Sequence, residues 1–136
     1  MQLRKIMFSL ILTIASSCEV LAQEKTTTLE MINKSPKCYA LTEIINLYSK
    51  GDNDNFEYFY INFSNAMKIQ SYPQDAGNAI PLLFNEFSRK FRNVVIKTII
   101  ESGYNQKSLS DIYDNIGCSV LAKKINDENI ILDTKN

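Results

Sequence analysis

The sequence predicts an all-α fold, a small disulfide-linked bundle of about four helices, and three observations support this prediction. Apolar residues recur at spacings of three and four in several stretches, which is typical of amphipathic helices. Most glycines and prolines fall between these stretches or near their ends, where helices begin or end. Two of the three cysteines, Cys38 and Cys118, lie far apart in the chain. The longest stretch runs from Ile80 to Ser102, and Gly103 follows it where a left-handed C-cap would end a helix. Its apolar face, predicted to lie in the core, comprises Ile80, Leu83, Phe84, Phe87, Phe91, Val94, Val95 and Ile99.

Residues 1–22 have the features of a secretory signal peptide. Arg4 and Lys5 form a basic region, Ile6 to Ala15 form an apolar region, and Val20-Leu21-Ala22 fits a signal-peptidase site. The apolar run is shorter than the about 20 residues needed to span a bilayer. An alternative is a lipoprotein signal that would anchor the chain through acylated Cys18, but Ala15 stands where such signals usually carry leucine. We therefore expect a periplasmic or secreted protein.

Residues 23–136 are predicted to form a single helical domain. Of the 15 basic and 15 acidic residues, Arg4, Lys5 and Glu19 belong to the signal, which leaves 13 and 14 and a net charge of −1. This balance gives no indication of a nucleic-acid partner or an anionic membrane surface.

Cys38 and Cys118 are the two cysteines of the mature chain. In an oxidising compartment such a pair is expected to form a disulfide. The bridge would close a loop of about 80 residues, worth about 4 to 5 kcal/mol in the chain-entropy model. Two buried free thiols or a redox pair are the alternatives, although no C-x-x-C motif is present.

The first half of the domain is expected to contain an arm and two helices. Residues 23–34 are polar and Thr-rich and are predicted to form the arm. Ser35-Pro36 fits an N-cap followed by proline at the first helical position, and Gly51 would close that helix. Residues 56–63 are rich in aromatic residues, as in a strand, but the helical spacing from Phe56 to Gln70 favours a second helix to about Ser71. Asp52 to Asn55 lacks the central glycine and the final glutamate of a calcium loop, so it predicts a cap and no metal site.

The second half is expected to contain two helices and a tail. Tyr72 to Asn78 breaks the chain before the long helix. Ser108 and Asp111 resemble a capping box at the start of a fourth helix, which Gly117 and Cys118 interrupt. Residues 126–136 are predicted to form a loosely packed tail. The fourth apolar face comprises Leu109, Ile112, Tyr113, Ile116 and Val120.

The chain contains no histidine, which excludes Ser-His and Cys-His nucleophile pairs and most catalytic zinc sites. No glycine-rich phosphate loop is present, and no cofactor is expected. Asp111 and Asp114 lie three residues apart and could act as an acid/base pair if one carboxyl had a raised pKa. Their position near a helix N-terminus favours a structural interpretation instead.

Five residues are candidates for binding a protein partner. Arg89 and Arg92 are three residues apart and could clamp an acidic group, although a solvated helix face is the simpler interpretation. Tyr72, Asp75 and Tyr104 lie in turns, and tyrosine is enriched at interfaces. Two Asn-x-Ser sequons, at Asn33 and Asn62, would accept glycans in a eukaryotic secretory pathway.

The positions of the two cysteines are similar to those in one protein family. One cysteine lies in the first predicted helix, in Lys37-Cys38-Tyr39-Ala40, and the other lies late in the chain, in Ile116-Gly117-Cys118-Ser119. This layout resembles that of periplasmic immunity proteins that accompany type VI secretion amidase effectors. The resemblance covers the layout alone and implies a secreted inhibitor that blocks the active site of a toxin or hydrolase. An envelope stress chaperone and a carboxylate-dependent enzyme are the two alternatives. A neighbouring gene for a secreted hydrolase would favour the first.

Overall fold

The computed structural model describes residues 26–49, 56–70, 78–126 and 130–131. In the described residues the order is β1 (Thr26–Thr27), α2 (Thr28–Ser49), α3 (Phe56–Ile69), α4 (Ala79–Ser102), α5 (Gln106–Ile116), α6 (Cys118–Leu121) and β2 (Ile130–Ile131). The chain is a small all-α bundle with four long helices and one short one among these residues, as predicted. The predicted signal peptide lies outside the described residues, as does the rejected calcium loop.

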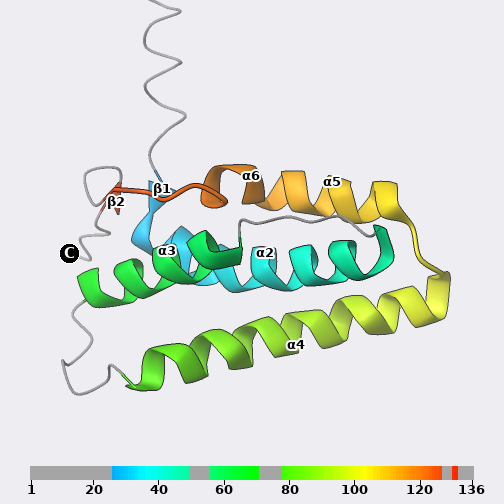
Figure 1. Ribbon diagram of the computed structural model, residues 1–136, viewed down its shortest axis with the longest axis horizontal. Coiled ribbons are helices and arrows are strands. Elements are labelled where there is room, and N and C mark those ends of the chain that lie inside the picture. Colours follow the sequence, from blue (N-terminus) through cyan, green and yellow to red (C-terminus); the bar gives the residue numbers. More distant parts are fainter. Residues whose placement is uncertain (1–25, 50–55, 71–77, 127–129, 132–136) are drawn as a thin grey trace, which may run out of the picture.

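Helix α2 is the centre of the bundle and contacts each of the other described helices. In Figure 1, α4 runs along the lower edge, α5 and α6 follow the upper edge, and α2 lies between them. Helix α3 packs on α2 and also contacts α4 and α6. The described part of the chain has no helix that is long and apolar enough to cross a membrane.

The core is formed where α2, α3 and α4 meet. Phe84 of α4 contacts the rings of Tyr39, Tyr60 and Phe63 edge-on, at centroid distances of 5.1, 5.3 and 5.2 Å. Such edge-to-face pairs stabilise a fold by more than the burial of their apolar surface alone. The largest fully buried apolar side chains are Phe59, Phe63, Met31, Leu41, Ile44 and Leu121.

Helix α2 begins at Thr28, so the predicted start at Ser35 is wrong. The cause is a capping box: Glu30 N donates to Thr27 Oγ1 at 3.2 Å, and Thr27 N donates to Glu30 Oε2 at 3.4 Å. Residues 28–34 therefore belong to the helix and not to an arm, and Met31 is fully buried. Pro36 lies inside the helix, where its ring removes one backbone donor.

The aromatic segment forms helix α3, which confirms the helical prediction over the strand alternative. Phe59 and Phe63 share one buried face. The long helix α4 is also confirmed and ends at Gly103, whose N–H donates to Ile99 O at 2.7 Å. Gly103 has φ 83° and ψ 161°, a positive-φ conformation outside the left-handed helical region, so the expected left-handed helical C-cap is wrong.

Helix α5 starts two residues before Ser108, so the predicted capping box with Asp111 is wrong. Asn105 is the N-cap, and its Oδ1 accepts from Ser108 N at 3.1 Å. Gly117, in the left-handed region at φ 85° and ψ 30°, ends α5 and redirects the chain into α6, as the predicted interruption requires. Cys118 then lies against α2 and forms the predicted disulfide with Cys38, with a Cα–Cα distance of 5.4 Å.

The C-terminal segment is more firmly packed at one point than the predicted loose tail. Ile130 is only 8% exposed and pairs in parallel with Thr26, and Ile131 pairs with Thr27. This two-residue pairing joins the two ends of the described chain. At Ile130 the prediction of a loosely packed tail is therefore wrong.

Candidate interaction groove

Helix α4 buries only part of the apolar face that the sequence assigns to the core. Ile80, Phe84 and Val95 are buried, whereas Phe87 and Val94 are 40% and 63% exposed. Phe91 is half-buried. The prediction of a core role is therefore wrong for Phe87 and Val94, which form part of an open surface.

These side chains line what we call the α4 groove, formed by two adjoining hollows that share Phe91 and Val94. The hollow beside α5 has a volume of about 400 Å³, and the hollow beside α2 has one of about 350 Å³. The lining is almost entirely apolar along the middle and polar at the ends. It comprises Asn33, Pro36 and Lys37 from α2; Phe87, Lys90, Phe91, Val94, Val95, Thr98, Ile99 and Ser102 from α4; Gly103 and Asn105 from the connection; and Ser108, Leu109 and Ile112 from α5.

The groove exists because the apolar side chains of α4 cover more of the helix surface than the neighbouring helices bury. The buried line of α4 passes through Ile80, Phe84, Ser88 and Val95. Ser88 is small, and its hydroxyl is satisfied within the helix by donating to Phe84 O at 2.8 Å. A second apolar line, spaced four, three and four residues apart, passes through Phe87, Phe91, Val94 and Thr98. Helices α2 and α3 cover the first line. The second line is only partly covered: the Phe87 ring contacts Phe63 of α3 and Lys37 lies over Phe91, while Val94 and Thr98 are exposed.

Positive charge gathers at the α2 end of the groove. Lys37 Nζ lies 5.9 Å from the centroid of the Phe91 ring, a cation–π contact. Lys90 Nζ lies 3.0 Å from Glu86 Oε1. The hydrogen bond from Lys90, together with its charge, lowers the pKa of the exposed Glu86 carboxyl. Neither Lys37 nor the exposed Arg89 forms an ion pair with another described residue.

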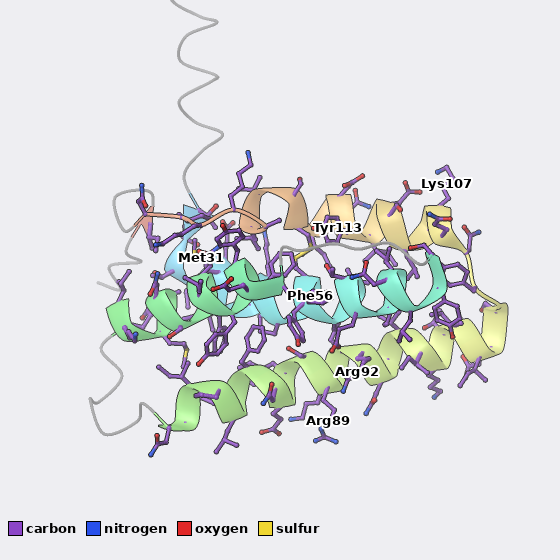
Figure 2. The ribbon with its side chains drawn as sticks, viewed as in Figure 1. Met31, Phe56, Arg89, Arg92, Lys107 and Tyr113 are labelled. Atoms are coloured by element: carbon purple, nitrogen blue, oxygen red, sulfur yellow. A yellow bond between two sulfur atoms is a disulfide. The ribbon has the colours of Figure 1, made fainter. Side chains whose placement is uncertain are left out.

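The predicted clamp of Arg89 and Arg92 does not form. Arg92 Nη1 donates to Glu43 Oε2 of α2 at 2.6 Å, so this guanidinium is used inside the bundle. Figure 2 shows Arg92 turned toward α2 and Arg89 turned away from the bundle. Arg89 is directed to solvent and does not line the groove.

Tyr104, the predicted tyrosine site that lies within the described residues, does not line the groove. The Tyr104 ring stacks on Tyr48 with centroids 4.4 Å apart and an interplanar angle of 17°. Its hydroxyl is buried and has no hydrogen-bond partner among the described residues. Tyr104 therefore packs against the bundle instead of offering its polar tip to a partner. Tyr72 and Asp75 lie outside the described residues.

The carboxylates considered for catalysis lie on the exposed side of α5. Asp111 Oδ2 accepts from Lys107 Nζ at 2.8 Å, with both side chains more than half exposed. Asp114 is exposed as well. Neither carboxylate lies in an apolar pocket that would prepare it for acid/base catalysis. Within the described ranges, no three His, Cys, Asp or Glu side chains come together to hold a metal ion.

Comparisons with protein-family models, curated proteins and solved structures find no match for this chain. The assignment of a function therefore depends on the geometry of the α4 groove. Sequence reasoning placed the groove residues in the core because helical spacing cannot tell a covered apolar line from an open one. One feature of the sequence could have distinguished buried from exposed residues: the apolar residues of α4 span a wider part of the helix circumference than one neighbouring helix can cover.

Proposed function

We propose that this chain is a secreted or periplasmic binding protein without catalytic activity, whose partner is another protein that docks in the α4 groove. The observation that carries the proposal is the exposure of Phe87 and Val94, with the half-buried Phe91 between them, in one continuous apolar groove. Large exposed apolar patches with polar edges are typical of protein-interaction sites. The signal-like N-terminus and the Cys38–Cys118 bridge support an oxidising compartment.

The scaffold beneath the groove supports a preorganised binder. The disulfide ties α2, which forms one end of the groove, to α6, which follows α5 at the other wall. The Arg92–Glu43 pair joins α4 to α2. A groove held in place in this way loses little conformational entropy when a partner binds. Inhibitor and immunity proteins require such tight, selective association, and the cysteine layout resembles that of an immunity family.

A chaperone of the cell envelope is the second candidate, because an apolar groove could also receive an unfolded client. The two functions differ in selectivity. An inhibitor binds one folded partner with a defined stoichiometry, whereas a chaperone binds many unfolded chains and is expected to expose more apolar surface at acid pH. The carboxylate-dependent enzyme is not proposed, since no observation favours it over the salt bridge that Asp111 makes.

The proposal is tested with two matched variants of α4. Val94→Glu places a charge in the groove, while Ile100→Glu changes a residue on the same helix that is 78% exposed and does not line the groove. The chain is immobilised and exposed to periplasmic extract of its source organism. Each protein retained is identified by mass spectrometry, purified and measured by calorimetry.

We expect a purified partner that binds the unmodified chain and Ile100→Glu with equal affinity. Its affinity for Val94→Glu is expected to fall at least about tenfold, because the new carboxylate would be buried without a partner. Circular dichroism is expected to show the same helical content in both variants. A partner whose affinity is the same for both variants, or the absence of any partner, would reject the groove as the binding site.

A further inference from the structure

We infer that the α4 groove receives an amphipathic helix of about four turns, whose acidic end lies at Lys37 and Lys90. This inference rests on the proposed function and identifies the element by which the partner protein binds. Three features of the groove support it: its length, the exposure of the apolar side chains along it, and the distribution of charge between its two ends.

The length of the groove corresponds to a helix. Its lining runs along α4 from Phe87 to Ser102, which at 1.5 Å per residue corresponds to about 22 Å, or about four helical turns. Helix α4 forms one wall, α5 forms the opposite wall at the far end, and α2 contributes Pro36 and Lys37 at the near end. A helix packed along this line would take the place of a further member of the bundle.

The exposure of the lining argues for a broad occupant. Val94 is 63% exposed, Phe87 40% and Ile112 39%, so these side chains rise from the groove as well as lining it. A single acyl chain lying in the hollows would leave the outer sides of these residues in water. A helix of about 10 Å diameter presents apolar side chains at spacings of three and four, which can cover the ridge of Phe87, Phe91 and Val94.

The charged residues that line the groove indicate which end of the bound helix is acidic. Lys37 and Lys90 line the near end. The far end is lined by Ser102, Asn105 and Ser108, which carry no charge. The lysines of α4 and α5 each have an acidic partner on their own helix: Lys90 pairs with Glu86, Lys97 with Glu101 and Lys107 with Asp111. Lys37 is therefore the unpaired charge among the described lining residues. It lies at the near end, where a carboxylate of the occupant would meet it beside Lys90.

The same charges disfavour a second copy of this chain as the occupant. Helix α4 carries four basic residues, Arg89, Lys90, Arg92 and Lys97, against the acidic Glu86 and Glu101. Both carboxylates are already paired, Glu86 with Lys90 and Glu101 with Lys97, so a second α4 laid in the groove would bring no free carboxylate to Lys37 and would add net positive charge there. Like charges placed together at an interface oppose association.

The test uses three fluorescent peptides built on one four-turn amphipathic helix. The first has two glutamates at one end, the second has lysines at the same positions, and the third keeps the acidic composition but scrambles the apolar positions. Their affinities are measured by fluorescence polarisation for the intact mature chain and for three variants. The variants are Val94→Glu, the double substitution Lys37→Glu with Lys90→Glu, and its charge-matched control Lys68→Glu with Lys124→Glu.

We expect the acidic peptide to bind the unmodified chain at least about tenfold more tightly than the basic peptide, and the scrambled peptide not to bind. The Lys37/Lys90 double variant is expected to reverse this preference, while the Lys68/Lys124 control retains it. The Val94→Glu variant is expected to bind neither the acidic nor the basic peptide. Helical content and thermal unfolding of each variant establish that the changes act on binding.

Other outcomes would overturn the inference in distinguishable ways. Equal binding of the acidic and basic peptides would reject the role of charge while leaving a groove for helices. Binding of oleate but of no peptide would identify an amphiphile site. A dimer in sedimentation equilibrium that Val94→Glu dissociates would identify a second copy as the occupant. The proposed function is decided separately, by the affinities of the purified partner for Val94→Glu and Ile100→Glu.

Discussion

The side chain of Asn62 on α3 binds the end of α6 at Leu121 and the chain that follows it. Asn62 Nδ2 donates to Leu121 O at 2.9 Å and to Lys123 O at 2.7 Å, while its Oδ1 accepts from Ile125 N at 3.1 Å. Asn62 is fully buried, so these three bonds satisfy backbone groups near the end of the domain. The side chain is thus inaccessible in the folded protein, and the sequon that contains it offers no glycan site there.

Replacing Asn62 by leucine is expected to destabilise the domain strongly. The substitution keeps the volume but leaves two carbonyls and one N–H without their partner, at a cost of about 1–3 kcal/mol for a buried group. We expect the free energy of unfolding in urea to fall by at least about 2 kcal/mol. Asn93→Leu, at an exposed position on α4, is the control and is expected to change it by no more than about 0.5 kcal/mol. Equal effects at the two sites would contradict the role assigned to Asn62.

Removing the disulfide is expected to lower stability through the unfolded chain. Cys38→Ala with Cys118→Ala opens a loop of 80 residues, and the chain-entropy model gives about 4–5 kcal/mol. Since single domains are stable by about 5–15 kcal/mol, the double variant is expected to be marginally folded at 37 °C. Guanidinium unfolding with and without reductant measures the effect, and reductant should not change the double variant. Stability within about 1 kcal/mol of the unmodified chain would refute this prediction.

The helices were predictable because each has a local signature. The spacing of apolar residues in α4, and the persistence of that spacing through the aromatic segment of α3, identified both helices. The disulfide followed from cysteine count and compartment. Helix starts were less predictable because several residues compete as caps. Ser35-Pro36 resembles a helix start, yet the reciprocal bonds of Thr27 and Glu30 begin α2 earlier.

The groove was not predictable because it depends on which side of α4 its neighbours occupy. Phe84 and Phe87 have the same chemical character, but Phe84 lies among three aromatic rings and Phe87 is at the edge of the groove. Arg92 likewise could not be separated from Arg89 by spacing. The carboxylate that binds it, Glu43, is on another helix and becomes a neighbour only through folding.

The Arg92–Glu43 pair is expected to couple α4 to α2 measurably. The side chains are 35% and 28% exposed and the N–O distance is 2.6 Å, so solvent screens this pair less than a fully exposed one. A double-mutant cycle with Arg92→Ala and Glu43→Ala is expected to give a coupling free energy of about 1 kcal/mol, at the upper end for pairs near a surface. The cycle is measured by urea unfolding at low ionic strength.

The Lys97–Glu101 pair provides the comparison for that cycle. Its N–O distance is 3.9 Å and its side chains are 77% and 63% exposed. We expect a coupling below about 0.5 kcal/mol, as for other exposed pairs spaced four apart on a helix. If the two cycles give the same value, Arg92 contributes no more than an ordinary surface charge.

Alkaline pH is expected to destabilise the domain through Tyr39 and Tyr113. Burial raises the pKa of Tyr39 above its usual 10.0, with a further contribution from the Glu43 charge, and burial is also the main cause of the raised pKa of Tyr113. The folded state therefore retains these phenolic protons at pH values where the unfolded chain releases them. The stability they contribute is fully present below pH 10 and is lost as pH rises through the raised pKa values.

Substituting both tyrosines by phenylalanine tests this dependence. The double variant is expected to lose less stability than the unmodified chain as pH rises above 10, because its phenyl rings cannot ionise. Urea unfolding at a series of alkaline pH values measures the difference, and near-ultraviolet absorbance reports ionisation of the tyrosines. Parallel pH profiles for the two proteins would show that neither residue is responsible.

The two glycines with positive φ are expected to respond differently to the same substitutions. A Cβ at Gly103 or Gly117 would meet no atom within 4 Å, so any cost comes from the backbone conformation. Gly117 is in the left-handed helical region, which asparagine tolerates, so Gly117→Asn is expected to cost less than Gly117→Ala, itself about 1–2 kcal/mol. Gly103 combines φ 83° with ψ 161°, a region populated almost only by glycine, so both substitutions there are expected to cost about 1–3 kcal/mol. Thermal unfolding of the four variants measures these costs. A smaller loss for Gly103→Asn than for Gly117→Asn would mean that the chain leaves α4 by a different path, and the far end of the groove would then have a different shape.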